Sequence, residues 1–159
     1  ANSRSQIADA STLHRAVHAR SEPESPMDSA LYFSFRPGAA HPADDGIISA
    51  WDIVDGPSIG TDTVVLSSCS TARGRVVAGE GIIGLARAFH VAGARTLIAS
   101  QWPVPDHSTA ELMTAFYEEI AAGSSNVDAL HRARRVIAGD PELAHPYHWA
   151  SFQIRGDWR

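Results

Sequence analysis

The sequence predicts an α/β domain in which a mostly parallel, open sheet is flanked by helices. Three observations support this prediction: runs of β-branched residues recur along the chain, amphipathic patterns of about a dozen residues lie between them, and Gly or Pro marks many of the boundaries. Strands that alternate with helices of this length are typical of parallel sheets with helical crossovers. With 159 residues, 44% of them apolar, the chain is long enough for one domain with a substantial core.

Short strands and loops are expected in the first part of the chain. Residues 12–17 are weakly strand-like, and residues 31–35 more clearly so. We expect Ser49 to cap a short helix through Ile53, because a serine side chain can accept an amide hydrogen of the first turn. The β-branched run at 63–68 is the clearest candidate for a buried strand.

The middle of the chain predicts a helix followed by a strand. A helix is expected over residues 80–92, with Gly93 as its terminator. Its apolar positions have helical spacing and should face the core. These positions are Ile82, Ile83, Ala86 and Phe89. A strand is expected over 95–100.

Two more helices and a last strand are expected near the carboxyl terminus. Ser108 and Glu111 have the spacing of a capping box and predict a helix that Gly123 ends. Asn126 is expected to cap the next helix. Residues 148–154 alternate apolar and polar positions and predict a final strand, whose inner positions should be Ala150, Phe152 and Ile154.

Composition excludes several functional classes. The net charge of −5 argues against a nucleic-acid partner, and the absence of a long apolar run argues against a membrane span. All 13 basic residues are Arg, so Schiff-base lysines and the phosphate-binding P-loop are excluded. A single cysteine forms no intrachain disulfide and no cysteine-based metal cluster. We therefore expect no metal and no cofactor, and a cytoplasmic location fits the lone thiol.

Cys69 is the strongest candidate for a reactive group. It directly follows the strand expected at 63–68, and ligands of parallel sheets bind beyond the carboxyl ends of the strands. Nearby Arg73 and Arg75 make its surroundings electropositive, which lowers a thiol pKa. A lone cysteine is also often a small core residue, and the residues alone leave these two interpretations equal. His18 follows another expected strand and could act as its base, with His14 as a rival.

A glycine motif suggests a different functional class, nucleotide binding. Residues 79–84 read GEGIIG and fit the fingerprint of a dinucleotide-binding loop. The fingerprint should directly follow a strand, whereas a loop of about ten residues separates it from the strand expected at 63–68. A structural junction between loop and helix is therefore favoured over nucleotide binding.

Several segments together resemble the CHAT family of caspase- and separase-like cysteine peptidases. Their order along the chain matches the family pattern from about residue 12 to residue 155. The matching segments are LHRAVHA at 13–19, DGIISAW at 45–51, LSSCST at 66–71, GEG at 79–81, AF at 88–89, AGAR at 92–95, ASQWPVPD at 99–106 and HPYHWA at 145–150. The sequence differs from the family pattern at Val17, Ser70 and Ala72.

The resemblance implies a caspase-like fold and a cysteine endopeptidase. Cys69 would be the nucleophile and His18 the base, with a protein or peptide as substrate. The backbone amides of Cys69 and Ala19 would stabilise the oxyanion. The alternative that it leaves open is a catalytically inactive scaffold or regulatory module of the same fold.

The resemblance also implies a specificity site. Residues 102–106 are similar to the separase W-x-V-x-D segment, whose acidic residue meets a substrate Arg. Asp106 would then bind a basic residue immediately before the scissile bond, and Trp102 would pack against its stem. An equally good interpretation is that Asp106 simply favours the start of the following helix.

Caspase-like folds contain strands before the one that carries the histidine. Only twelve residues precede Leu13, which is too few for a strand and its crossover. We therefore expect residues 1–159 to form a single domain that lacks its first strand or strands. The edge left open should pair with another copy or with a missing N-terminal segment.

Overall fold

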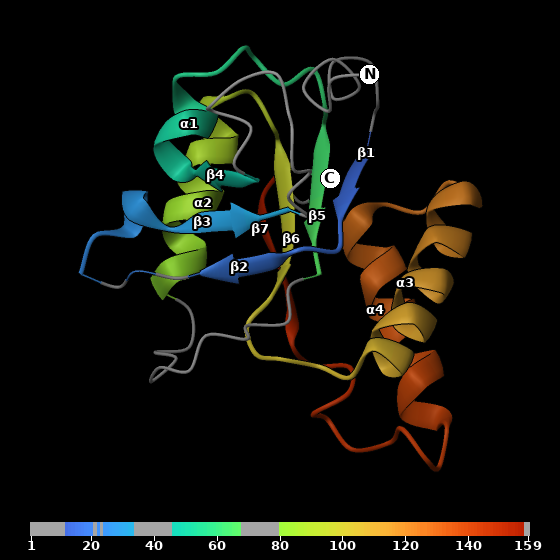
Figure 1. The fold of residues 1–159 in the computed structure, drawn as a ribbon. Coiled ribbons are helices and arrows are strands. Elements are labelled where there is room, and N and C mark those ends of the chain that lie inside the picture. Colours follow the sequence, from blue (N-terminus) through green and yellow to red (C-terminus); the bar gives the residue numbers. More distant parts are fainter. Residues whose placement is uncertain (1–11, 21, 23, 34–45, 68–79, 158–159) are drawn as a thin grey trace.

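The computed structural model describes residues 12–20, 22, 24–33, 46–67 and 80–157, with the side chains of residues 80–82 left aside. Its main sheet has four strands in the order β1-β5-β6-β7 (Figure 1). Their bounds are β1 Thr12–Arg15, β5 Thr63–Leu66, β6 Thr96–Ser100 and β7 Phe152–Gly156. The first three are parallel, and β7 runs antiparallel to β6. The predicted mostly parallel sheet is confirmed.

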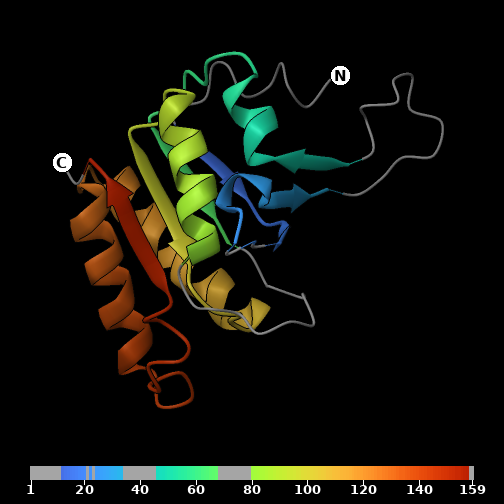
Figure 2. The same cartoon turned by 90° about the vertical axis from the view of Figure 1, so that its left-hand side faces the viewer.

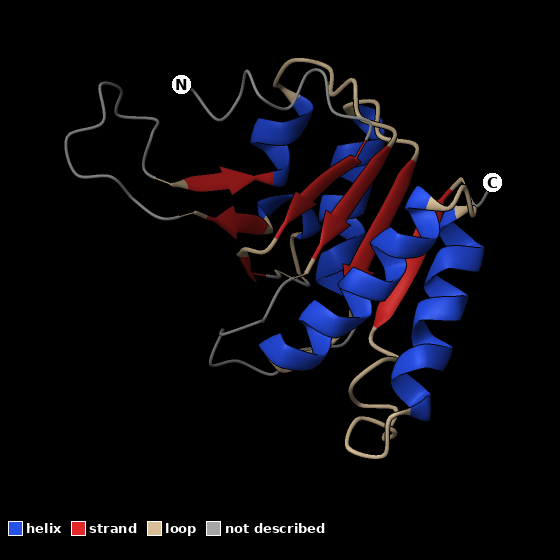
Figure 3. Ribbon diagram, turned by 90° about the vertical axis from the view of Figure 1, so that its right-hand side faces the viewer, coloured by secondary structure: helices blue, strands red, loops and turns tan. Residues whose placement is uncertain are grey.

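Helices cover both faces of the main sheet. The helices are α1 Ala50–Val54, α2 Glu80–Val91, α3 Asp106–Ala121 and α4 Asn126–Gly139. Figure 2 shows α1 and α2 on one face, and Figure 3 shows α3 and α4 on the other. Successive strand residues point to opposite faces, so Val64 packs with α2 whereas Val65 packs with α3 and α4. The sequence pattern therefore builds two cores, one on each side of a single sheet.

A small antiparallel sheet lies beside α1 and α2. Its strands are β2 His18–Arg20, β3 Ala30–Tyr32 and β4 Ile47–Ser49, with a 3-10 turn, η1 Pro26–Asp28, before β3. Ser49 caps α1 as predicted: its hydroxyl accepts the Asp52 amide, and the Asp52 carboxylate accepts the Ser49 amide. This reciprocal capping fixes the point at which β4 turns into α1.

The first strand is shorter than predicted. β1 ends at Arg15, where it pairs with Leu66, and the Arg15 carbonyl still accepts the amide of Ser67. The chain then turns, so that His18 begins β2 in the small sheet. The sequence pattern over 12–17 could not show this turn because both strands are extended. Among the described residues, β1 pairs only with β5, and the expected partner for its other edge stays a prediction.

Both predicted caps near the carboxyl terminus were placed wrongly. α3 begins at Asp106, after Pro105, and the buried Ser108 hydroxyl donates to the Pro105 carbonyl. Ser125 caps α4 by accepting the Asp128 amide, whereas the Asn126 side chain donates to Thr63 on β5. Ser108 and Asn126, the predicted caps, therefore use their side chains for other hydrogen bonds.

Two other expectations need correction. Ile83 was expected on the buried face of α2, but it is 47% exposed, because the stripe that faces the core is centred on Leu85, Ala86 and Phe89. The last strand begins at Phe152 and not at His148, and residues 145–150 form turns.

Gly84 couples α2 to the small sheet. A β-carbon at this position would overlap the backbone carbonyl of Pro26 in η1. We expect Gly84→Ala to lower the free energy of unfolding by about 1–3 kcal/mol, the usual cost of overpacking. The measurement is urea unfolding. Gly139→Ala is the control, because a β-carbon at Gly139 in α4 meets open space. Equal stability of the two variants would contradict this close packing.

Candidate active site

The carboxyl ends of β1 and β5 lie side by side. The strands pair in register, with Arg15 opposite Leu66, and so end at the same level. Both residues of the predicted dyad lie three positions beyond these ends in the sequence, His18 after Arg15 and Cys69 after Leu66. Cys69 itself lies outside the described residues, so the dyad stays a prediction.

His18 is the first residue of β2. It pairs with Tyr32 of β3 and is exposed, whereas the next residue, Ala19, pairs with Leu31 and is half-buried. The turn after β1 therefore places His18 between the main sheet and the small one.

A cavity of about 290 Å³ opens beside these strand ends. It lies among β1, β5, β6 and the first turns of α3. Its lining residues are His14, Ala16, Ser67, Ser100, Val104, Asp106, Thr109, Ala110, Met113 and Phe152. Its lining combines apolar side chains, such as Val104, Met113 and Phe152, with the polar side chains of His14, Ser67, Ser100, Asp106 and Thr109.

Asp106 reaches this cavity from the first position of α3. Its side chain is exposed, at the helix end where the dipole favours a negative charge. Val104, which is buried two residues earlier, anchors the segment that leads into the helix. The structure thus places Asp106 beside the cavity and also at a helix start, so both interpretations of this residue from the sequence describe its position.

Trp102 does not line the cavity. Its indole N–H donates to the Tyr147 carbonyl at 3.0 Å, and its side chain is half-buried. The ring of Tyr147 in turn meets His148 edge-on, and His148 is within hydrogen-bonding distance of Ser108 at 3.1 Å. Trp102 therefore ties the segment after β6 to the turns before β7, and its contact with a substrate stays a prediction.

His14 has a larger place in the site than the sequence indicated. Its Nε2 lies 2.9 Å from the Ser67 Oγ, and its ring is 5.6 Å from that of Tyr117 on α3. Burial lowers the pKa of His14 from its ordinary value of 6.5. Burial also raises the pKa of Tyr117 to about 12. The neutral forms of both side chains are thereby favoured.

Sequence reasoning missed Ser67 and Tyr117 as members of the site. Ser67 could have been found by alternation, because it lies one position beyond β5 on the face of Val65. Tyr117 has a helical spacing that indicates only a core position, so nothing in the sequence linked it to His14.

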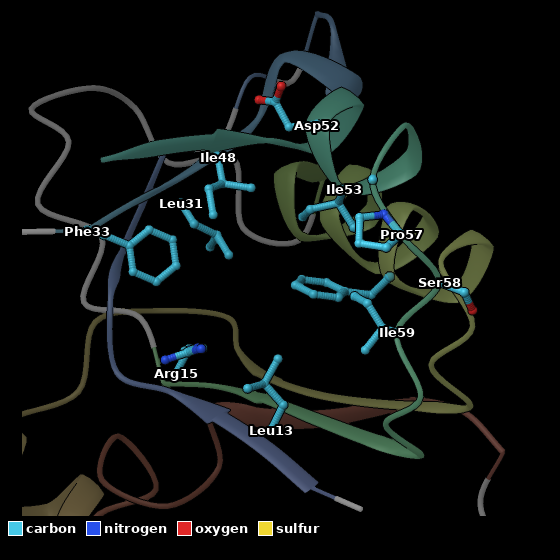
Figure 4. A pocket seen from close by; sticks show the side chains of 12 residues that line it. Leu13, Arg15, Leu31, Phe33, Ile48, Asp52, Ile53, Pro57, Ser58 and Ile59 are labelled. Atoms are coloured by element: carbon cyan, nitrogen blue, oxygen red, sulfur yellow. The ribbon is translucent and has the colours of Figure 1, made fainter. Parts of the chain in front are cut away.

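A second cavity, of about 120 Å³, lies on the opposite face of β1 (Figure 4). It is mainly apolar, with Leu13, Leu31 and Phe89 among its lining residues. Its two charged residues already have partners: the Arg15 guanidinium lies over the ring of Phe33, which lines the same cavity, at 5.9 Å, and Asp52 belongs to the α1 cap. Its Ser58 hydroxyl donates to the Ala92 carbonyl at 3.2 Å, so the first cavity, with Asp106 and the His14–Ser67 pair, is the better candidate site.

The described part of the chain contains no group of three or more His, Cys, Asp or Glu side chains arranged to hold a metal ion. In the same residues, no helix combines the length and apolar character that a membrane span requires.

Comparison with known proteins gives one family and two similar relatives. The sequence model of the CHAT domain matches residues 2–157. The mouse Tetratricopeptide repeat protein 28 is 34% identical over 110 residues, and the human protein of that name is 33% identical over 115 residues. These matches cover 69% and 72% of this chain but only 4% and 5% of the relatives.

Proposed function

The chain belongs to the CHAT domain family, which is related to cysteine peptidases, and from this premise we propose that it is a cysteine endopeptidase with a Cys69–His18 dyad. The observation that best supports the proposal is that the adjacent parallel strands β1 and β5 end at the same level, beside a cavity. The sequence brings Cys69 and His18 equally far beyond these strands. Parallel sheets bind their ligands at such ends.

The dyad would work by covalent catalysis. The imidazole of His18 takes the proton of the Cys69 thiol, and the thiolate attacks the scissile carbonyl carbon. The carbon–nitrogen bond breaks, the imidazolium gives its proton to the leaving amine, and an acyl-enzyme remains. Water, deprotonated by His18, then hydrolyses the thioester and restores the thiol. The backbone amides of Cys69 and Ala19 are the proposed donors to the oxyanion.

We propose that the enzyme cleaves after a basic residue. The cavity beside the strand ends carries a carboxylate, Asp106, and apolar walls that suit the stem of an arginine. Its volume of about 290 Å³ accommodates one long side chain. We also propose that Trp102 packs against the arginine stem. This contact requires the segment after β6 to move, because the Trp102 indole N–H donates a hydrogen bond to the Tyr147 carbonyl.

The second candidate function is that of an inactive scaffold or regulatory module. Two observations favour it: Val17, Ser70 and Ala72 differ from the family pattern around the dyad, and the similar relatives are named for tetratricopeptide repeats and not for hydrolysis. In that case the partner is a protein that binds without being cleaved. A cytoplasmic location fits either function.

Alkylation of Cys69 separates the two candidates. At pH 6.5 we expect iodoacetamide to react with Cys69 faster than with a free cysteine, whose pKa is about 8.5, and more slowly in His18→Ala. The reason is that an adjacent imidazole stabilises the thiolate. The rate is measured by mass spectrometry of the labelled peptide. A rate that follows the titration of an ordinary thiol and ignores His18→Ala would support the scaffold.

A further inference from the structure

Besides the hydroxyls of Ser100 and Thr109, the cavity is lined by two sets of polar groups. Asp106 brings a carboxylate from the start of α3, and the His14–Ser67 pair brings an imidazole and a hydroxyl from the ends of β1 and β5. A basic side chain that enters the cavity would therefore contact both the Asp106 carboxylate and the His14–Ser67 pair. The proposed dyad mechanism uses neither His14 nor Ser67.

The direction of the His14–Ser67 hydrogen bond determines what the cavity offers. When Nε2 of a neutral His14 accepts the Ser67 hydroxyl proton, the lone pairs of the Ser67 oxygen remain available to accept from a guest. When the ring is protonated, Nε2 must donate, so Ser67 turns its own hydroxyl hydrogen outward. Protonation of His14 thus replaces an acceptor by a donor and adds a positive charge to the cavity wall.

We propose that His14 is a specificity-determining residue that, through Ser67, admits a basic side chain to the cavity when its ring is neutral and excludes it when the ring is protonated. This inference rests on the proposed function in one respect, the binding of a basic residue beside Asp106. Asp106 and Ser67 then form two acceptors for one guanidinium, which donates from several nitrogens in a fixed plane.

The groups around His14 determine what its protonation does to the cavity. Its neighbours are Ser67, just beyond β5, and the Tyr117 ring on α3, and Asp106 at the start of α3 lines the same cavity. Arg15, its neighbour on β1, points to the opposite face of the sheet. Among the described residues that line the cavity, Asp106 is therefore the charged group that a protonated His14 would partly neutralise. Burial lowers the pKa of His14 from its ordinary value of 6.5, so the ring is neutral at neutral pH, and in the proposal this is the state that admits the basic side chain.

The test measures binding and does not depend on catalysis. The Cys69→Ala chain is titrated with acetyl-arginine amide and with its neutral analogue, acetyl-citrulline amide, from pH 8 to pH 5, with isothermal calorimetry as the readout. We expect the arginine probe to bind at least tenfold more weakly at pH 5. The repulsion between two like charges several ångströms apart near a protein surface is large enough to lower the binding constant by about that factor. The citrulline probe should show little change.

Two variants identify the group responsible. His14→Gln, which cannot take up a proton, should remove most of the pH dependence while the probe still binds at pH 8. Ser67→Ala should weaken binding at pH 8 by about tenfold, the usual loss for a hydrogen bond to a charged group. Circular dichroism checks that both variants are folded. An unchanged pH dependence in His14→Gln, or an equal dependence for citrulline, overturns the proposal.

The outcomes also separate this inference from the proposed function. If the arginine probe binds with the expected pH dependence but the wild-type chain cleaves no peptide, the role of His14 stands and the peptidase fails. If the chain cleaves after arginine with a preference over citrulline that His14→Gln leaves unchanged at every pH, the peptidase stands and the role of His14 fails.

Discussion

His18→Ala is expected to lower kcat for hydrolysis of an arginine-containing peptide by about 10²–10⁴-fold, the range that a positioned general base contributes. Cys69→Ala should abolish hydrolysis, because the acyl-enzyme can no longer form. The two losses should not add in the double variant, since both residues act in one step. The measurement is steady-state cleavage of a fluorogenic peptide.

His131→Ala serves as the control for these variants. His131 is exposed on α4, on the face of the sheet away from the small sheet that holds His18. Its replacement should leave kcat unchanged. If His18→Ala behaved like His131→Ala, the imidazole of His18 would have no part in the reaction.

Asp106→Asn is expected to remove the preference for arginine over alanine before the scissile bond. The amide keeps the size of the side chain but loses the charge that pairs with the guanidinium. Loss of a hydrogen bond to a charged group costs about 1.5–3 kcal/mol, which corresponds to a fall in relative kcat/KM for the arginine peptide of roughly tenfold or more. Paired Arg and Ala peptides, assayed with both proteins, give this ratio directly.

Glu111→Gln is the matched control for Asp106→Asn. Glu111 lies on the same helix, but its carboxylate contacts His107 at 3.1 Å and does not line the cavity. It should leave the ratio unchanged. If Asp106→Asn had the same Arg/Ala ratio as the wild type, Asp106 would act only at the start of α3. The melting temperatures of the two variants would then show how much it stabilises the helix.

The strongest local patterns predicted the fold well. The β-branched run after residue 62 is a fully buried strand, and the α1 cap is a reciprocal bond between Ser49 and Asp52, because both depend on neighbours within a few residues. The cap of α3 was misplaced because the helix begins earlier, at Asp106, and Ser108 bonds back to the Pro105 carbonyl, whereas the cap of α4 was misplaced because a contact from a distant part of the chain takes up the predicted side chain. Asn126, for example, donates to Thr63 on β5, which no local pattern can indicate.

The candidate site was predicted only in part for a similar reason. The ends of the expected strands placed Cys69 at one edge of the sheet, and the resemblance of residues 102–106 added Asp106. The sequence pattern could not show that the chain turns after Arg15, or that Tyr117 packs on His14 from α3. The turn cannot be seen because β1 and β2 are both extended, and the contact with Tyr117 depends on how α3 packs on the sheet. Because of that contact and its place in the cavity lining, we interpret His14 as a lining residue and no longer as a rival base.

The most direct test of the dyad is an experimental structure of the chain with a peptide aldehyde that ends in arginine. The proposed mechanism predicts a bond between the Cys69 sulfur and the aldehyde carbon, with a His18 ring nitrogen within about 4 Å of that sulfur. The arginine side chain should lie in the cavity beside Asp106. A Cys69 sulfur that points away from His18, more than about 7 Å from its ring and unmodified by the aldehyde, would contradict the dyad.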